Sequence, residues 1–460
     1  MLILGLIFTY LIGLLAIHTV SVQFNLAEKA GLSFPIGIGI QTLCILLADL
    51  VGLPLNLTVI SIVSVLFVSI LSFFLYKRKN EYLAFYKASF RFDYKQYNLV
   101  WLFLISIIAY FEYMNFAKCM YFPTFDRDSL AGFDTIGYVI AQEHTFHDLS
   151  LFQVDYMPHM QKAGSYISYI PMIQLSYAYV YLLGATTSKI IPALMYLSLI
   201  VAFYGCLKRL IGHTGSALIT FLMLITPEMI AFSSLSATNT IHAVYASLGI
   251  IYIAIWIKER KKKDLYIGSL LLALNLWTRM DGIAFIGAAG LVILIDSLRR
   301  RQFQELIPVS LSLIPALVWG IYSQLYNLTS ESIAILYPFW DKEKATLIYE
   351  NFYQLFTNTQ YYGYTFVALI LSLLANSWYL LKKRDNLALL SMFITAALLY
   401  MISLYQVNYL WDSINNVLAY SAKRFLFCFV PIAWFYASSN EWCQHVCRKL
   451  DTLLSLKVTK

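Results

Sequence analysis

Three aspartates and an arginine lie close together in one hydrophilic segment of the chain. Asp126, Arg127 and Asp128 are followed by Asp134 and Tyr138. If this segment is helical from Asp128 onward, Asp134 and Tyr138 lie one turn apart on the same face. A carboxylate held at a membrane boundary beside an arginine can serve as a general base. The segment therefore predicts an acid–base site, with a solvated acidic loop or a helix cap at Asp128 as the alternative.

The same carboxylates could also chelate a divalent cation. Asp126 and Asp128 supply hard oxygen ligands, which suit Mg²⁺ or Mn²⁺. A D-x-D pair is common by chance, so the sequence requires no cofactor and leaves a divalent cation as an alternative. Cys443, His445 and Cys447 superficially resemble a metal cluster, but C-x-x-x-C spacing at a helix end is a weak signal for zinc.

Two cationic segments lie where a membrane protein rarely keeps charge. Arg279 lies between two apolar stretches, where a charge is costly unless it pairs or binds something, and Asp281 is its simplest partner. Lys423 and Arg424 precede the last apolar stretch on its external side, against the usual bias of positive charge toward the cytoplasm. Since phosphate matches guanidinium geometry bidentately, we predict that Arg424, Lys423 and Arg279 hold a lipid phosphate.

The elements that must position these residues are apolar stretches long enough to cross a bilayer. The chain has 460 residues, of which 60% are hydrophobic and 13% charged, against roughly 25% charged in a soluble domain. Continuous apolar runs of about 20 residues favour spanning helices over a barrel. We predict an all-α polytopic membrane protein with about 13–14 transmembrane helices and a helical first external loop. The expected spans are about 2–18, 33–53, 55–76, 98–117, 166–184, 190–207, 213–232, 240–257, 264–279, 282–297, 305–326, 361–381, 387–404 and 422–439.

Short basic loops orient the chain. Lysine and arginine concentrate between the apolar stretches, which indicates that these loops are cytoplasmic. This explains the formal charge of +8 without nucleic-acid binding. The expected domains are N-terminal helices with a basic loop (1–97), a catalytic membrane module (98–439) with external loops at about 118–165 and 327–360, and a cytoplasmic tail (440–460).

One pair of expected spans conflicts with this orientation. The stretches 166–184 and 190–207 cannot both cross the membrane if the loop before them is external while Lys208 and Arg209 are cytoplasmic. Either one stretch re-enters the membrane or the basic pair is an exception.

The arrangement resembles the GT-C superfamily of membrane glycosyltransferases, including the dolichyl-phosphate-mannose-protein mannosyltransferases and the aminoarabinose transferases. Those enzymes carry an Asp-rich motif in a first large external loop, which is similar either to Asp128–Phe133 or to Asp134–Tyr138 here. Their tyrosine-proline entry into the next span resembles Tyr169-Ile170-Pro171, with one residue inserted. Their later motifs resemble Pro227, Thr278-Arg279, Arg424-Phe425 and Pro431. The resemblance covers about residues 98–435 and lacks the family's Asp-Glu pair.

The resemblance implies transfer of a hexosyl or pentosyl group from a polyprenyl-phosphate sugar to a glycan, lipid or protein acceptor. It places the reaction on the extracytoplasmic side of a cell membrane, with the bacterial inner membrane as the expected location. Asp128 or Asp134 would be the base, with Asp126 beside it, and direct displacement would invert the anomeric carbon. Tyr138, Arg127 and Tyr169 would contact the substrates.

Two other functions share parts of this pattern. A transporter or lipid-carrier flippase would use the external charges as a vestibule, and it predicts essential ionisable residues near the middle of spans. A polysaccharide polymerase or ligase would use the same kind of donor and differ in what it joins.

Overall fold

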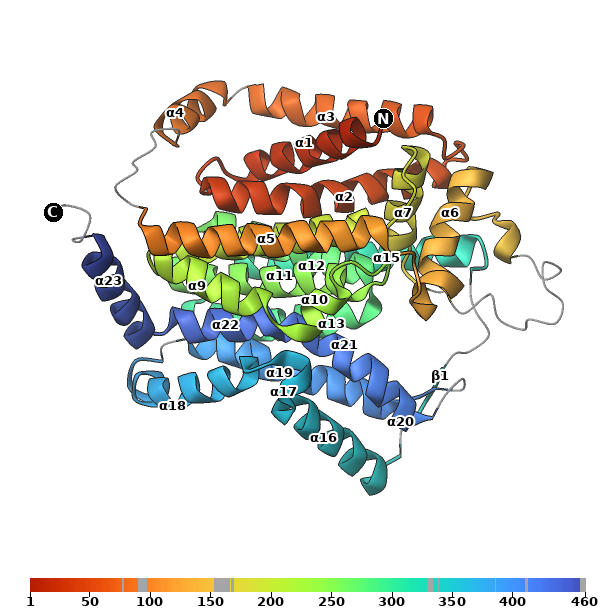
Figure 1. Cartoon of the computed structure of the whole chain (residues 1–460). Coiled ribbons are helices and arrows are strands. Elements are labelled where there is room, and N and C mark those ends of the chain that lie inside the picture. The colour runs from red at the N-terminus through yellow and green to blue at the C-terminus, as the bar shows by residue number, and fades with distance from the viewer. Residues whose placement is uncertain are drawn as a thin grey trace.

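The computed structural model describes residues 1–76, 78–89, 97–152, 166, 169–328, 334–337, 339–384, 386–409 and 413–455. Within these ranges the chain forms a helical bundle, with helices that run side by side along one direction (Figure 1). This agrees with the predicted all-α polytopic membrane protein.

Eleven helical segments in the described ranges are long and apolar enough to cross a membrane. Several are broken by short 3₁₀ or π turns that do not interrupt the crossing. They are α1 (Leu2–Val20), α2 (Leu26–Leu50), α3 (Leu57–Tyr76), α5 (Leu99–Tyr121), α8 (Ile190–Lys208), α11 (Asn239–Glu259), α13 (Ile283–Arg300), α14 with α15 (Leu306–Leu311 and Ile314–Leu325), α18 (Thr365–Lys383), α19 (Leu387–Gln406), and α20, α21 and α22 in series (Ile414–Val417, Lys423–Phe425 and Phe429–Ser439).

Ion pairs between helix ends reveal two further passes. Arg260 Nη1 lies 2.6 Å from Asp296 Oδ2, which joins the end of α11 to the end of α13. Since α13 follows α12 (Lys262–Thr278) directly, α12 must return across the bundle between them. Arg209 Nη1 lies 2.9 Å from Asp264 Oδ1, which joins the end of α8 to the start of α12.

The second ion pair fixes the path between α8 and α11. Arg209 lies at the end of α8, and Asp264 lies just after the end of α11, so α8 and α11 end on the same side of the bundle. Since α11 therefore begins on the opposite side, the chain between the end of α8 and the start of α11 must cross the bundle. The crossing is made by α9 (His213–Leu224) and α10 (Pro227–Phe232). With α12 this brings the eleven spans to thirteen passes among the described residues, within the predicted range.

Among the expected spans, the one that does not cross the bundle is 166–184, which contains α7 (Met172–Leu182). Its 11 residues rise about 16 Å, roughly half of what a bilayer requires. In Figure 1 it stands across the direction of α2 and α5. The conflict between the expected spans 166–184 and 190–207 is therefore resolved, because only the second crosses, as α8. The expectation that 166–184 is a full span is wrong.

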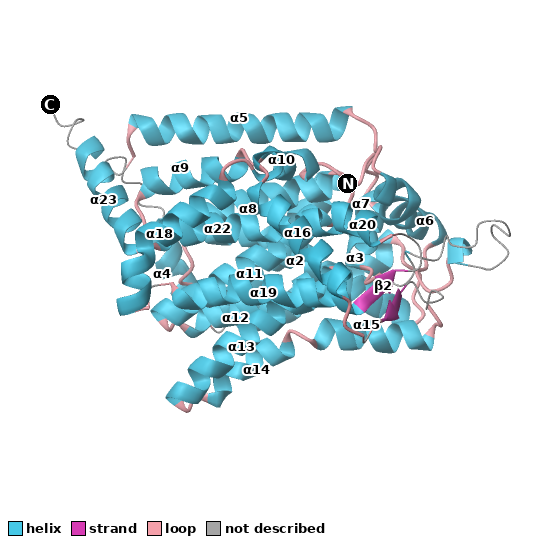
Figure 2. Cartoon of the chain, turned by 90° about the horizontal axis from the view of Figure 1, so that it is seen from below, coloured by secondary structure: helices cyan, strands magenta, loops and turns pink. Residues whose placement is uncertain are grey.

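The bundle has two distinct ends. One end, which we call the α6 end, carries α6 (Asp134–Glu143), α7, α16 (Lys342–Thr357), α17 (Thr359–Tyr362) and α20 (Figure 1). It also carries β1 (Ala334–Leu336) and β2 (Val407–Tyr409), an antiparallel pair with Ile335 opposite Asn408, drawn in magenta in Figure 2. This pair joins the predicted external loop at about 327–360 to the segment that follows α19, and it is a small departure from an all-α fold.

The opposite end, which we call the basic end, carries α4 (Lys79–Ser89) and α23 (Glu441–Ser455). The basic loops after α11, α13 and α18 lie here, as the ion pair of Arg260 with Asp296 illustrates. The predicted positive-inside pattern thus separates the two ends, and the acidic segment lies opposite the basic loops.

Close packing of small residues ties α1 to α2. A Cβ atom on Gly37 would lie 1.9 Å from the Thr9 carbonyl oxygen, and one on Gly13 would lie 1.8 Å from the Ser33 carbonyl oxygen. Such contacts are the usual way for helices to approach in a membrane, where burial of apolar surface gives little driving force. The approach fixes α2, whose far end reaches the α6 end at Asp49.

Candidate active site

The predicted acidic segment is helical and is capped by its first aspartate. The backbone N–H and the hydroxyl of Ser129 both donate to Asp126 Oδ2, each at 3.2 Å. A π-helical turn from Ser129 to Phe133 follows and leads directly into α6. The predicted helix from Asp128 onward is confirmed, but the capping carboxylate is that of Asp126.

Asp134 is the most enclosed of the three aspartates, with 8% of its surface exposed. The Tyr181 hydroxyl donates to Asp134 Oδ1 at 2.6 Å, and the Thr124 hydroxyl donates to Oδ2 at 3.2 Å. Tyr138 packs edge-on against the Tyr181 ring, with centroids 5.4 Å apart. The two contacts of Tyr181 tie α6 to α7, and the two hydroxyl donors to Asp134 are neutral.

Asp128 lies where two distant parts of the chain meet. The Tyr166 hydroxyl donates to Asp128 Oδ1 at 3.1 Å, and Arg424 Nη1 donates to Oδ2. Arg424 belongs to α21, at the start of the last span, and its guanidinium also lies 5.7 Å from the Phe232 ring. The structure thus joins a predicted base to a predicted phosphate-binding cation.

Lys423 is held at the neighbouring position by a second acidic residue. Its Nζ lies 3.2 Å from Glu228 Oε1 of α10 and 4.7 Å from the Tyr361 ring centre. The Tyr362 hydroxyl donates to the Lys423 carbonyl at 2.6 Å. These contacts bring α10, α17 and α21 together at the α6 end.

Arg279 has the simple partner that its sequence context suggested. It donates to Asp281 through Nη2 at 2.7 Å and through Nε at 3.1 Å. Its Nη1 lies 3.3 Å from both the Thr238 hydroxyl and the Asn239 side-chain oxygen, at the start of α11. Its side chain is therefore fixed by the turn that follows it and by the start of α11.

The Arg279 pair and the Asp128 pair are linked by aromatic residues. His242 Nε2 lies 3.6 Å from Asp281 Oδ1, and the His242 ring lies 6.2 Å from Phe425, the residue after Arg424. Phe425 also stacks in parallel on Tyr400, with centroids 3.5 Å apart. Both cations therefore border the entry to the last span.

Tyr169 lies between the two pairs. Its ring stacks on Tyr166 at 5.7 Å and meets Phe133 edge-on at 5.4 Å. Desolvation by the surrounding protein raises the pKa of Tyr169, and the charges of four groups also act on its hydroxyl. Those groups are Arg279, Asp128, Asp281 and Arg424. The Tyr169 phenol therefore stays protonated, and its hydroxyl is within electrostatic reach of both cations predicted to hold phosphate.

Two predicted site residues make fewer contacts with the charged groups of the site. Arg127 is exposed, although its charge acts on the Tyr166 hydroxyl. Tyr138 is half exposed and contacts Asp134 only through Tyr181.

The predicted metal ligands are engaged by protein donors. Asp126 caps its helix and Asp128 accepts from Tyr166 and Arg424. A divalent cation at this D-x-D pair would have to displace the Arg424 guanidinium. The described residues contain no group of three or more His, Cys, Asp or Glu side chains that could hold a metal ion, and this includes Cys443 and Cys447, whose sulfurs are 4.0 Å apart.

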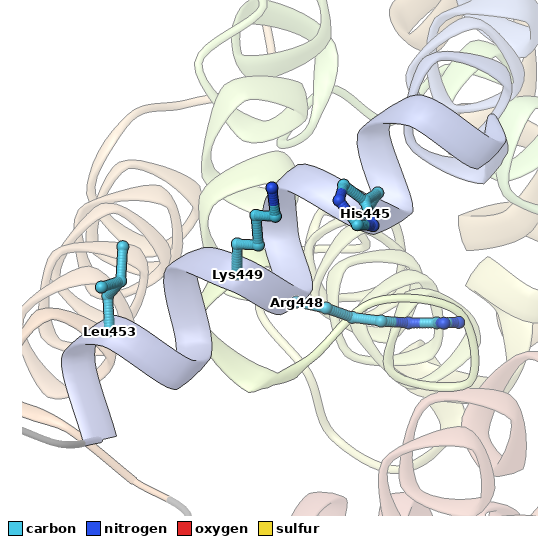
Figure 3. Close-up of a pocket in the computed structure, with 4 residues that line it drawn as sticks. All are labelled: His445, Arg448, Lys449 and Leu453. Atoms are coloured by element: carbon cyan, nitrogen blue, oxygen red, sulfur yellow. The ribbon is translucent and has the colours of Figure 1, made fainter.

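A hollow of about 350 Å³ lies at the basic end, far from the site described above. It is lined by His445, Arg448, Lys449 and Leu453, all on α23 (Figure 3). These side chains approach none of the aspartates at the α6 end.

Sequence reasoning missed three contributors to this end of the molecule. Glu228 follows Pro227 at the end of an expected span. Its negative charge, which pairs with Lys423, was the feature of the sequence that could have identified it. Tyr181 lies in a stretch that reads as an ordinary span. Asp49, at the end of α2, accepts from the Phe146 N–H at 3.0 Å and contacts His147 Nδ1 at 2.8 Å.

Comparison with known proteins identifies the middle of the chain. Residues 171–323 match the family model described as dolichyl-phosphate-mannose-protein mannosyltransferase. The match contains Glu228, His242, Arg279 and Asp281, while the aspartates of the first loop and Arg424 lie outside it. No curated protein and no solved structure matches the chain. The resemblance to the GT-C membrane glycosyltransferases is therefore confirmed over residues 171–323, where this multi-pass membrane protein is similar to the dolichyl-phosphate-mannose-protein mannosyltransferase family.

Proposed function

We propose that this protein transfers a hexosyl or pentosyl group from a polyprenyl-phosphate sugar to an acceptor at the α6 end, the extracytoplasmic side. The observation that carries the proposal is the contact between Asp128 and Arg424. It joins a carboxylate that can take a proton to a cation that can hold a phosphate. The family match over residues 171–323 supports the same reaction class.

The reaction requires a base for the acceptor hydroxyl and a cationic group for the leaving phosphate. The acceptor hydroxyl oxygen forms a bond to the anomeric carbon, while the bond from that carbon to the phosphate oxygen breaks. The phosphate leaves with the bonding electrons, and the acceptor proton passes to a carboxylate. A single displacement of this kind inverts the anomeric centre, by the geometric logic that distinguishes inverting from retaining glycosidases.

Asp128 is the better candidate for the base. Its side chain is 30% exposed, so an acceptor hydroxyl can approach it, whereas Asp134 is nearly enclosed and holds α6 on α7. Asp126 is engaged in capping the same segment and acts as a positioning residue.

The leaving phosphate would be held by Arg424, Lys423 and Arg279. Arg424 and Lys423 lie 5.7 and 6.0 Å from the Phe232 ring, and the charges of Arg424 and Arg279 both act on the Tyr169 hydroxyl, so the three cations can approach one anion. Fixed cations of this kind stabilise charge that develops during bond cleavage, and each such donor typically contributes about 2.7–4 kcal/mol. Tyr169, Tyr138 and Arg127 line the approach to the sugar and the acceptor.

The partners in this proposal are a polyprenyl-phosphate sugar, a glycan, lipid or protein acceptor, and the surrounding bilayer. The expected location is the bacterial inner membrane. A polymerase or ligase uses the same donor, and the size of the product separates these functions.

The deciding experiment uses purified full-length protein and a panel of radiolabelled polyprenyl-phosphate sugars. Wild-type protein is expected to transfer the label, and Asp128→Asn to lower the rate by about 10²- to 10⁴-fold, because the acceptor proton loses its base. Asp148→Asn is the matched control, since Asp148 is exposed in the same loop. Undiminished transfer by Asp128→Asn would exclude Asp128 as the base.

One observation favours a second candidate, a transporter or flippase. Glu112 lies well inside α5 with 5% of its surface exposed, as the transporter alternative requires. Flux of a labelled polyprenyl-phosphate sugar into liposomes, measured without an acceptor, separates carriage from transfer.

A further inference from the structure

Asp128 and Arg424 have conflicting tasks if the proposed function is correct. Each is engaged with the other, since Arg424 Nη1 donates to Asp128 Oδ2. Yet transfer needs Arg424 on the donor phosphate and Asp128 on the acceptor hydroxyl. We propose that the donor phosphate displaces Asp128 from Arg424, so that binding of the donor releases the base. This inference rests on the proposed function and concerns the regulation of the same site.

The local geometry allows this exchange. Arg424 meets Asp128 through one nitrogen, whereas Arg279 holds Asp281 through two. The Arg424 and Asp128 side chains are 20% and 30% exposed, so water can reach both while they separate. Phosphate competes well for a guanidinium because it can accept two parallel hydrogen bonds.

Tyr166 keeps Asp128 in place after the exchange. Its hydroxyl donates to Asp128 Oδ1, the oxygen that Arg424 does not contact. Burial, together with the charge of Asp128, raises the pKa of Tyr166, so the phenol stays protonated and remains a donor. The released carboxylate therefore keeps one neutral hydrogen bond and exposes its other oxygen to the acceptor.

The exchange makes the order of events explicit. Before the donor binds, Arg424 occupies one carboxylate oxygen of Asp128. After the donor binds, the base is released beside the anomeric carbon that it serves. Because coupling between sites is reciprocal, a ligand hydrogen-bonded to Asp128 should also strengthen phosphate binding.

The test is a binding measurement with a short-chain polyprenyl phosphate on purified full-length protein in nanodiscs. Asp128→Asn is expected to bind it about two- to tenfold more tightly than wild type, because the phosphate no longer has to break an ion pair. Polyprenol, which lacks the phosphate, is expected to bind both proteins equally and so reports correct folding. Unchanged or weaker binding of the phosphate to a folded Asp128→Asn protein would overturn the proposal.

Three variants isolate the effect. Asp296→Asn removes a carboxylate that pairs with Arg260 at the basic end, and it should leave phosphate binding unchanged. Asp134→Asn removes a nearby carboxylate that accepts hydrogen bonds from neutral hydroxyls and whose charge acts on Lys189, and it should change binding by less than about twofold. In an Arg424→Gln background, Asp128→Asn should not tighten phosphate binding, because the cation for which Asp128 and the phosphate compete is absent. A gain that persists in that background would refute the exchange.

Failure of this inference is distinguishable from failure of the proposed function. If wild-type protein transfers sugar and loses activity in Asp128→Asn, but binding does not tighten, the exchange is wrong and the function stands. If binding tightens as expected and no donor in the panel is ever used, the exchange stands and the function is wrong.

Discussion

Asp128 and Asp134 are six residues apart, yet their surroundings differ in kind. Asp128 accepts from a guanidinium and a phenol and is partly exposed, whereas Asp134 accepts from two neutral hydroxyls and is nearly enclosed. A charged donor beside an accessible carboxylate gives acid–base chemistry, while neutral donors around a buried one hold helices together. The two roles could not be assigned from the sequence, because each depends on a partner more than 30 residues away.

A substitution at Glu112 tests the transporter alternative at the level of a single residue. Its Oε2 is buried without a hydrogen-bond partner among the described residues, near Asn115 and Tyr196. Glu112→Gln is therefore expected to leave sugar transfer within about twofold of wild type and to maintain or raise the midpoint of thermal unfolding, since burying an unpaired carboxylate is costly. Loss of liposome flux with transfer retained would instead assign Glu112 to carriage.

At the scale of elements, the first external loop is clamped at several points. Its early part is held by Tyr181 through Asp134, and its later part by Asp49 at the end of α2. Asp49 is 1% exposed and receives the Tyr322 hydroxyl in addition to Phe146 and His147. The N-terminal helices thus support the site, although the family match does not include them.

Asp49→Asn should weaken this clamp. The Phe146 N–H donates to one Asp49 oxygen and the Tyr322 hydroxyl to the other, and an amide keeps only one of these oxygens, so one of the two buried donors loses its acceptor. The expected loss is about 1–3 kcal/mol of unfolding free energy, seen as a lower midpoint in a thermal unfolding assay of purified protein. Asp148→Asn in the same loop is the control and should melt like wild type. Equal midpoints for the two variants would show that the clamp contributes little.

At the scale of the whole molecule, the bundle depends on close helix contacts more than on apolar burial. Gly37→Ala is expected to push α1 from α2, because the added carbon would lie 1.9 Å from the Thr9 carbonyl oxygen. Overpacking typically costs about 1–3 kcal/mol, so the unfolding midpoint should fall. Gly320→Ala is the matched control, since no atom lies within 4 Å of its added carbon. A Gly37→Ala protein as stable as Gly320→Ala would contradict the packing argument.

The span pattern and the separation of the basic loops from the acidic segment were properties of the sequence alone. Crossing a bilayer depends on the length and polarity of a continuous stretch, and basic residues concentrate in the short loops between such stretches, so both can be predicted locally. The same reasoning failed at 166–184, because the apolar stretch contains a helix of only 11 residues that lies across the bundle as α7.

The residue types of the site were also determined by the sequence, since three aspartates and three misplaced cations are visible without a structure. Their pairing was decided only by the tertiary structure. Asp128 meets Arg424 and Lys423 meets Glu228 because the ends of α5, α10 and α21 converge at one face. That convergence depends on how thirteen passes pack against each other, and no local pattern of residues encodes it.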